Sequence, residues 1–197
     1  MVGIFGHIQT GRLILILNTF MLMAGCAVGT SSTIVKSPPG TTTTFILVRH
    51  AEKADLTPES PLSVAGQERA RALADALAPL GVTAIYCPAL RRNRETVQPL
   101  SEHLGLAVLT IPGWQLLSTR QFAQNFIQKA LANHGGGVIL WAGNSSAVGA
   151  WGSNLQELYQ QLGGDGQGPR AYDDLFVIVV DDSGAINIQK RHFGKRR

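Results

Sequence analysis

Arg49 and His50 follow directly on the apolar run Phe45–Val48, inside the segment LVRHAEK. Arg92 comes later, after a second short apolar run that ends at Tyr86. A neutral imidazole is a nucleophile near neutral pH. Guanidinium groups bind phosphate oxygens in pairs and stabilise the charge that develops during phosphoryl transfer. These residue types together are suited to a site for a phosphate dianion, provided that the fold brings them together.

The elements around these residues predict that they meet at one edge of a sheet. Phe45–Val48 and Val82–Tyr86 are apolar enough to be buried parallel strands, which carry functional residues at their carboxyl ends. We expect these two strands to be adjacent. The helix expected over Arg91–His103 begins beside them, and the free N–H groups of a helix N-terminus favour an anion. An Arg-His pair after a strand is by itself a common surface feature, so the prediction depends on the combination.

Strands alternate with helices along the rest of the chain. A helix is expected from the cap Ser63 to about Leu80, because its apolar positions recur at spacings of three and four. Further helices are predicted over 121–133 and 146–162, and further strands over 106–111, 138–141, 175–180 and 185–189. This alternation predicts a three-layer α/β domain, with a mostly parallel sheet, helices on both faces and an antiparallel C-terminal hairpin.

Four segments in this order resemble the histidine phosphatase superfamily, the phosphoglycerate mutase-like group, in its small bacterial branch. They are LVRHAEK, PLSVAGQERARALADAL, the spacing of Tyr86, Arg92 and Thr96, and the closing YDDLFVIVV. Each motif is modest alone, but their order and spacing are fairly specific, and they span about residues 44–190.

The resemblance implies a role for each matching residue. His50 would be the nucleophile that becomes phosphohistidine, and Arg49 and Arg92 would grip the phosphate. Glu52, close to the nucleophile, would support substrate binding. The resemblance implies no cofactor and no metal, and the sequence contains no Cys/His cluster with metal-ligand spacing.

The sequence departs from the family at the second histidine. The family places it in a Gly-His-Ser-Asn-Thr-like run, whereas this chain has Gly143-Asn144-Ser145-Ser146-Ala147. The amide of Asn144 can donate a hydrogen bond to a phosphoryl oxygen but cannot supply a positive charge. His134 precedes the strand over 138–141, at its opposite end, and we expect it to be a loop residue rather than a replacement.

The proton donor is the second departure. Family members often place an acid in the stretch between Glu102 and Glu157, where this chain has no Asp or Glu. Protonation of the leaving group contributes about 10²–10⁴-fold to rate. The candidates that remain are Glu52 and the pair Asp173 and Asp174, which could equally be a solvated turn.

Two functions follow from these departures. One is a phosphomonoesterase that works through phosphohistidine and is slow because Asn144 replaces a histidine. The alternative is a catalytically inactive lipoprotein of the same fold that binds a phosphorylated ligand. An α/β domain with a chance basic crevice is the third and weakest hypothesis, because four motifs in this order rarely arise by chance.

The first forty residues are typical of an export signal and a linker. The apolar run Leu13–Gly25 follows Arg12 and is shorter than the ~20 residues that span a membrane. Met23–Cys26 resembles the bacterial lipoprotein signal, which predicts a signal peptide over 1–25 and a lipid on Cys26. The segment 26–43 reads as a flexible tether and 44–197 as the domain. An ordinary signal peptide or a buried N-terminal helix remains the alternative.

The signal predicts an exported protein, lipid-anchored in the bacterial cell envelope and facing the periplasm. Cys87 would then lack a disulfide partner, because Cys26 is the other cysteine of the chain. The net charge of +4 does not indicate nucleic acid binding, since five of the 17 basic residues lie in the last eight positions. The expected partners are a phosphorylated substrate or ligand and a membrane, with no nucleic acid.

Overall fold

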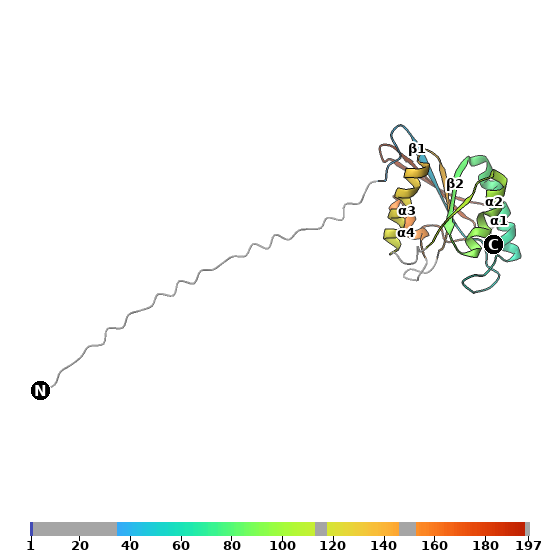
Figure 1. The fold of residues 1–197 in the computed structure, drawn as a ribbon, viewed down its shortest axis with the longest axis horizontal. Coiled ribbons are helices and arrows are strands. Elements are labelled where there is room, and N and C mark those ends of the chain that lie inside the picture. Colours follow the sequence, from blue (N-terminus) through green and yellow to red (C-terminus); the bar gives the residue numbers. More distant parts are fainter. Residues whose placement is uncertain (2–34, 113–117, 146–152, 196–197) are drawn as a thin grey trace. The chain divides into compact units, whose positions relative to one another are not determined.

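The structure, a computed structural model, describes Met1 and residues 35–112, 118–145 and 153–195. Residues 33–197 form one compact unit (Figure 1). The predicted signal peptide apart from Met1, the predicted lipidation site Cys26 and residues 26–34 of the tether lie outside the described residues. Within the described part of the chain, no helix is both long and apolar enough to cross a membrane.

A six-stranded sheet forms the centre of this unit, in the order β3-β2-β4-β1-β5-β6. The strands are β1 Thr42–Arg49, β2 Val82–Pro88, β3 Val108–Ile111, β4 Val138–Gly143, β5 Asp174–Asp181 and β6 Ile186–His192. The first four strands of that order are parallel, and β5 and β6 form the antiparallel hairpin. The predicted mixed sheet is therefore confirmed. The expected adjacency of the first two strands is wrong, because β4 lies between β1 and β2 and pairs with both.

Helices cover both faces of the sheet, as predicted. They are α1 Val64–Leu77, η1 Ala78–Leu80, α2 Arg91–Leu104, α3 Thr119–His134 and α4 Leu155–Gln161. In Figure 1, α1 and α2 lie on one side of the sheet and α3 and α4 on the other.

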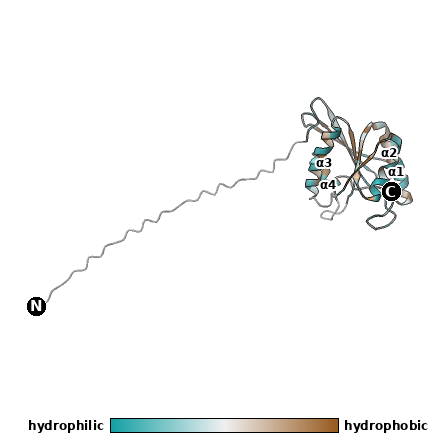
Figure 2. Cartoon of the chain, in the orientation of Figure 1, coloured by the Kyte–Doolittle hydropathy of each residue, from teal (hydrophilic) through white to brown (hydrophobic). Residues whose placement is uncertain are grey.

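Strand β1 contributes side chains to the hydrophobic cores on both faces of the sheet. Successive side chains of a strand point to opposite faces. Phe45 and Leu47 accordingly pack with the α3 and α4 residues, whereas Ile46 and Val48 pack with α1 and α2. Hydrophobic residues concentrate along the strands in Figure 2, with polar residues on the outer sides of the helices. The sheet is thus the middle of three layers.

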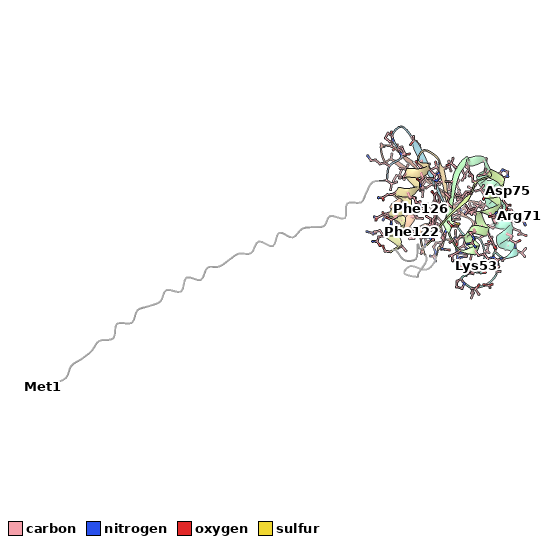
Figure 3. The ribbon with its side chains drawn as sticks, in the orientation of Figure 1. Met1, Lys53, Arg71, Asp75, Phe122 and Phe126 are labelled. Carbon is pink, nitrogen blue, oxygen red and sulfur yellow. The ribbon has the colours of Figure 1, made fainter. Side chains whose placement is uncertain are left out.

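Helix faces follow the same division. Phe122 and Phe126 of α3 are each 2% exposed, and their rings lie against the sheet residue Trp141 at centroid distances of 5.3 and 4.6 Å. Arg71 and Asp75 of α1 are exposed on the outer surface (Figure 3). The predicted cap of α1 is confirmed, since Ser63 Oγ accepts a hydrogen bond from Gly66 N at 3.1 Å.

Two predicted boundaries differ from the structure. The helix predicted over 146–162 is found as α4, which begins at Leu155; residues 146–152 lie outside the described residues. The buried Asn154 before α4 accepts hydrogen bonds from Trp141 and Asn144 with its side-chain oxygen. The domain begins before the predicted residue 44. Thr43 is fully buried in β1, and its hydroxyl lies 2.7 Å from that of Ser37, which is also buried.

Candidate active site

The carboxyl ends of β1 and β4 and the start of α2 lie together. Arg49 ends β1, Gly143 ends β4, and His50 N donates to the Gly143 carbonyl at 2.9 Å. Because β1 and β2 are both parallel to β4, α2, which follows β2, begins at the same edge of the sheet. Asn144 follows β4 between the two strands and contacts Arg92 in the first turn of α2. The predicted convergence is therefore found, with β4 as its centre.

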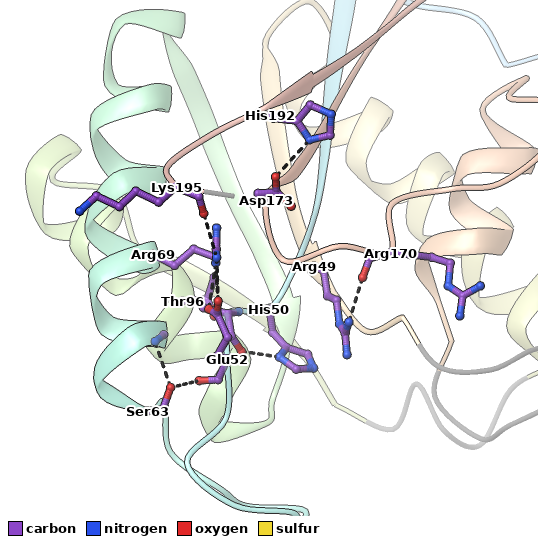
Figure 4. Close-up of polar contacts among 12 residues, drawn as sticks. Arg49, His50, Glu52, Ser63, Arg69, Thr96, Arg170, Asp173, His192 and Lys195 are labelled. Carbon is purple, nitrogen blue, oxygen red and sulfur yellow. Dashed lines mark hydrogen bonds and ion pairs between the residues drawn. The ribbon is translucent and has the colours of Figure 1, made fainter. Parts of the chain in front are cut away.

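The ring of His50 is held in one orientation. Its Nδ1 lies 2.7 Å from the Ala51 carbonyl oxygen (Figure 4). A carbonyl oxygen only accepts, so Nδ1 carries the proton and Nε2 carries the lone pair. His50 is 5% exposed. The structure thus presents Nε2 as the nucleophilic nitrogen.

The environment of His50 keeps the imidazole neutral. Burial is the main reason that the pKa of His50 falls from 6.5 to about 4, and the hydrogen bond to Ala51 works against it. Nearby positive charges lower this pKa further, namely those of Arg92, Arg49 and Lys53. A neutral ring is the form that can attack phosphorus.

Arg92 is fixed by contacts from two segments. Its Nη1 donates to the Pro58 carbonyl at 2.7 Å, and its Nη2 donates to Asn144 Oδ1 at 3.1 Å. Its Nε is buried and has no hydrogen-bond partner among the described residues. Burial lowers the pKa of Arg92, and the nearby Glu59 carboxylate opposes that effect. The Nε–H of Arg92 is thus a donor that a ligand could use.

Arg49 is also fixed by contacts from another segment of the chain. Its Nη1 donates to the Arg170 carbonyl at 2.8 Å, and its guanidinium carbon lies 4.1 Å from the centre of the Tyr172 ring. Its Nε is also buried without a partner in the described part of the chain. A guanidinium stacked on an aromatic face is restrained in its orientation.

Asn144 is held by Asn154, a residue that the sequence did not single out. Asn154 Oδ1 accepts from Asn144 N at 2.9 Å and from Trp141 Nε1 at 3.2 Å. Asn144 is 5% exposed, and its Nδ2 is buried without a partner in the described ranges. No sequence signal marked Asn154, because it lay inside a predicted helix.

Three buried donors therefore lack acceptors around the nucleophilic histidine. They are Arg49 Nε, Arg92 Nε and Asn144 Nδ2. Native structures rarely leave buried polar groups unpaired, because each costs about 1–3 kcal/mol. A phosphoryl group carries enough oxygens to accept from all three. The arrangement is that of an anion site with a nitrogen nucleophile.

Thr96 of α2 ties this site together. Its Oγ1 accepts from Ala51 N at 2.9 Å and donates to the Arg92 carbonyl at 2.7 Å. One hydroxyl thus joins the backbone after His50 to the turn that carries Arg92. This contact gives a physical reason for the spacing of arginine and threonine in the sequence.

The chain matches the model of the histidine phosphatase superfamily, branch 1, over residues 45–161. The chain belongs to the histidine phosphatase superfamily. No curated protein sequence matches the chain. The assignment covers the strands, α2 and the asparagine that form the site described above.

Solved structures of this fold resemble the chain at low sequence identity. A mycobacterial glucosyl-3-phosphoglycerate phosphatase in complex with inorganic phosphate is 16% identical, with a TM-score of 0.54 over 75% of this chain and 95% of its own. The protein histidine phosphatase SixA with tungstate is 17% identical (TM-score 0.55, 76% and 96%). A phosphoglycerate mutase from Bacillus anthracis is 14% identical (TM-score 0.58, 80% and 94%). These likenesses support the fold.

Glu52 of this histidine phosphatase domain is paired with Arg69 of α1. Its carboxylate makes a two-pronged ion pair with Arg69 of α1, with three N···O distances of 2.7–2.9 Å. Both side chains are largely buried. A Cβ on Gly66 would lie 2.2 Å from the Glu52 carbonyl oxygen, so this turn packs directly on α1. These contacts indicate a structural role for Glu52.

Asp173 and Asp174 lie against the hairpin strand β6. His192 Nδ1 is 3.4 Å from Asp173 Oδ2 and 3.5 Å from Asp174 Oδ1. Asp174 Oδ2 also accepts from the backbone N–H groups of Arg170 and Ala171. Among the described residues, these three side chains are the group whose donor atoms lie close enough to hold a metal ion.

His134 lies away from the anion site, but the expectation that it is a loop residue is wrong, because it is the last residue of α3. It ends α3, before β4, and its ring packs edge-on against Tyr86 with a centroid distance of 5.7 Å. The anion site lies at the carboxyl end of β4, so the expectation that His134 sits at the opposite end is confirmed.

Proposed function

We propose that this protein is a phosphomonoesterase that works through a phosphohistidine intermediate. His50 Nε2 attacks the phosphorus of a monoester, and Arg49, Arg92 and Asn144 donate hydrogen bonds to the phosphoryl oxygens. Water then releases the phosphate from His50. The observation that carries this proposal is the free lone pair of Nε2 beside three buried donors without acceptors. Phosphatases among the proteins of similar fold support it.

We propose in addition that turnover is slow. Asn144 supplies a neutral donor where the resemblance implies a second histidine. A charge-assisted hydrogen bond is about twice as strong as a neutral one. Loss of one donor to the transition state costs about 10²–10³-fold in other enzymes. The transition state therefore gains less from Asn144 than it would from a cation.

The test is hydrolysis of p-nitrophenyl phosphate by the full-length protein and its His50→Asn variant. We expect His50→Asn to abolish turnover and to remove an acid-labile phosphoryl label from the protein. The matched control is His134→Asn, which changes a histidine outside the site and should leave the rate unchanged. Undiminished turnover in His50→Asn would overturn the proposal.

The inactive alternative predicts binding without chemistry. Vanadate binding measured with Arg49→Lys and Arg92→Lys separates the two hypotheses, because lysine cannot form the paired contacts of a guanidinium. Arg91→Lys is the control, since Arg91 is exposed and pairs with Glu95 at 2.6 Å. Vanadate affinity that needs Arg49 and Arg92, with no His50-dependent turnover on a broad panel of phosphomonoesters, would identify a ligand-binding module.

The proposed location is the bacterial cell envelope, with a lipid on Cys26 as the membrane anchor. The support is the short apolar run Leu13–Gly25 and the Met23–Cys26 sequence. Labelled palmitate should enter the wild type and Cys87→Ala, whose cysteine is buried in the domain, but not Cys26→Ala. Label retained in Cys26→Ala would contradict the anchor.

A further inference from the structure

The proposed reaction needs a proton for the leaving group, so the carboxylates of the chain are the first candidates. All 13 Asp and Glu residues of the chain lie within the described residues. Three were candidates from the sequence. Glu52 is ion-paired with Arg69. Asp173 and Asp174 both lie next to His192. Asp174 also accepts hydrogen bonds from two backbone N–H groups. The oxygens of these three carboxylates are thus turned to partners on α1, on β6 and on the backbone just before β5.

Of the two glutamates near the start of α2, one remains a candidate proton donor. Glu95 accepts from Leu62 N at 2.7 Å and from Arg91 at 2.6 Å, so its two oxygens are engaged. Glu59 is exposed in the loop whose Pro58 carbonyl contacts Arg92. Its charge acts on Arg92, which places Glu59 near the site. Glu59 is therefore the alternative proton donor that the experiment must distinguish from any other candidate.

Tyr172 lies directly at the anion site. Its ring centre is 5.9 Å from that of His50 and 4.1 Å from the guanidinium carbon of Arg49. The topology explains this position. Strand β5 is antiparallel to β1 and pairs Leu175 with Val48, so the residues just before β5 lie beside the end of β1. Tyr172 thus occupies the edge of the sheet where His50 stands.

The surroundings of Tyr172 suit a group that gives up a proton and takes it back. The stacked Arg49 guanidinium would stabilise the phenolate that forms. Tyr172 is also one of the groups whose charge raises the pKa of Arg92, so its phenol is close to both guanidinium groups. A phenol is an established type of general acid in enzymes.

We propose that the phenol of Tyr172 is the proton donor to the leaving group, an inference that rests on the proposed phosphatase function. In the first step the bond from His50 Nε2 to phosphorus forms, the ester P–O bond breaks, and the leaving oxygen takes the proton of the Tyr172 hydroxyl. In the second step water attacks phosphorus and gives one proton to the phenolate. The P–N bond breaks, and hydrogen phosphate leaves.

The test compares Tyr172→Phe with the wild-type protein on two substrates. Glycerol 3-phosphate has an alkoxide leaving group that needs a proton, whereas p-nitrophenolate leaves readily without one. We expect Tyr172→Phe to lower the single-turnover rate at which glycerol 3-phosphate phosphorylates His50 by about 10²–10⁴-fold, and to lower the same rate with p-nitrophenyl phosphate far less. Vanadate affinity should be unchanged, because phenylalanine keeps the ring over Arg49.

Three results would overturn the inference. Equal rates of Tyr172→Phe and wild type on glycerol 3-phosphate would show that the hydroxyl gives no proton. An equal loss of the phosphorylation rate on both substrates would show that Tyr172 acts through the position of Arg49. A loss confined to glycerol 3-phosphate in Glu59→Gln, but not in Tyr172→Phe, would assign the role to Glu59. Failure of the phosphatase function itself is distinguishable, because the wild type would then not hydrolyse p-nitrophenyl phosphate.

Discussion

Asn144 Oδ1 accepts a hydrogen bond from Arg92 Nη2 at 3.1 Å, and this contact decides which way the amide faces. A guanidinium only donates, so the oxygen must face Arg92 and the Nδ2 group must point elsewhere. That Nδ2 group is buried without a partner among the described residues, as are the Nε atoms of Arg49 and Arg92. The asparagine therefore adds a neutral donor to the two arginines and does not disrupt them.

Asn144→Ala removes this donor. We expect kcat/KM on p-nitrophenyl phosphate to fall by about 10²-fold, because the phosphoryl oxygen loses one hydrogen bond in the transition state. Asn144→His should raise kcat above wild type, since an imidazolium donates a charge-assisted bond. Steady-state kinetics measure both, with the exposed Asn133→Ala as the control. An unchanged rate in Asn144→Ala would place the amide outside the reaction.

His50 should titrate far below an ordinary histidine. Burial is the main reason that the pKa of His50 is lowered to about 4. The imidazole signals of His50 should therefore shift with a midpoint near pH 4 in a ¹H–¹⁵N NMR titration without phosphate. His103, on the last turn of α2 and exposed, is the internal comparison. A His50 midpoint near 6.5 would contradict the buried, cation-flanked environment.

The same pKa predicts how stability depends on pH. Because the folded pKa of His50 lies below the unfolded value of 6.5, the unfolded state binds more protons between pH 4 and 6.5. Stability from this group is complete above pH 6.5 and is lost as the pH falls to about 4. The loss is about 3 kcal/mol of unfolding free energy, and His50→Asn should lack it. Urea denaturation of both proteins across this range, without added anions, measures the difference.

The ion pair of Glu52 and Arg69 predicts a stability effect rather than a chemical one. The Arg69 side chain is 6% exposed and that of Glu52 is 17% exposed. Glu52→Gln leaves a buried guanidinium without its counter-charge, which should cost about 3 kcal/mol of unfolding free energy. The kcat of the folded protein should be nearly unchanged, because the carboxylate faces Arg69. A large fall in kcat with unchanged stability would show that the Glu52 carboxylate takes part in the reaction.

Several features of the site could be predicted because they depend on local order along the chain. Apolar runs followed by Arg49-His50 and by Arg92 indicate strand ends, and parallel strand ends share one edge of a sheet. Thr96 follows Arg92 by one helical turn, so its contact with the Arg92 carbonyl is local. The alternation of strands and helices likewise predicted the three layers.

Other features could not be predicted because they join distant segments. The position of β4 between β1 and β2 depends on strand pairing, which the apolar runs do not specify. Asn154 binds Asn144 and Trp141 only after the segment between them has turned back on the sheet. Tyr172 reaches His50 only because β5 runs antiparallel to β1.

By itself, the amino-acid sequence determined the reactive groups, their order, and the presence of asparagine at position 144. Side-chain chemistry and chain order need no folded geometry to be known. Only the tertiary structure decided which of these groups are available for chemistry. It pairs Glu52 with Arg69 of α1 and Asp173 with His192 of β6, while it leaves three donors beside Nε2 of His50 without acceptors. Burial and hydrogen-bond pairing are properties of contacts between distant segments, so they arise only when the chain has folded.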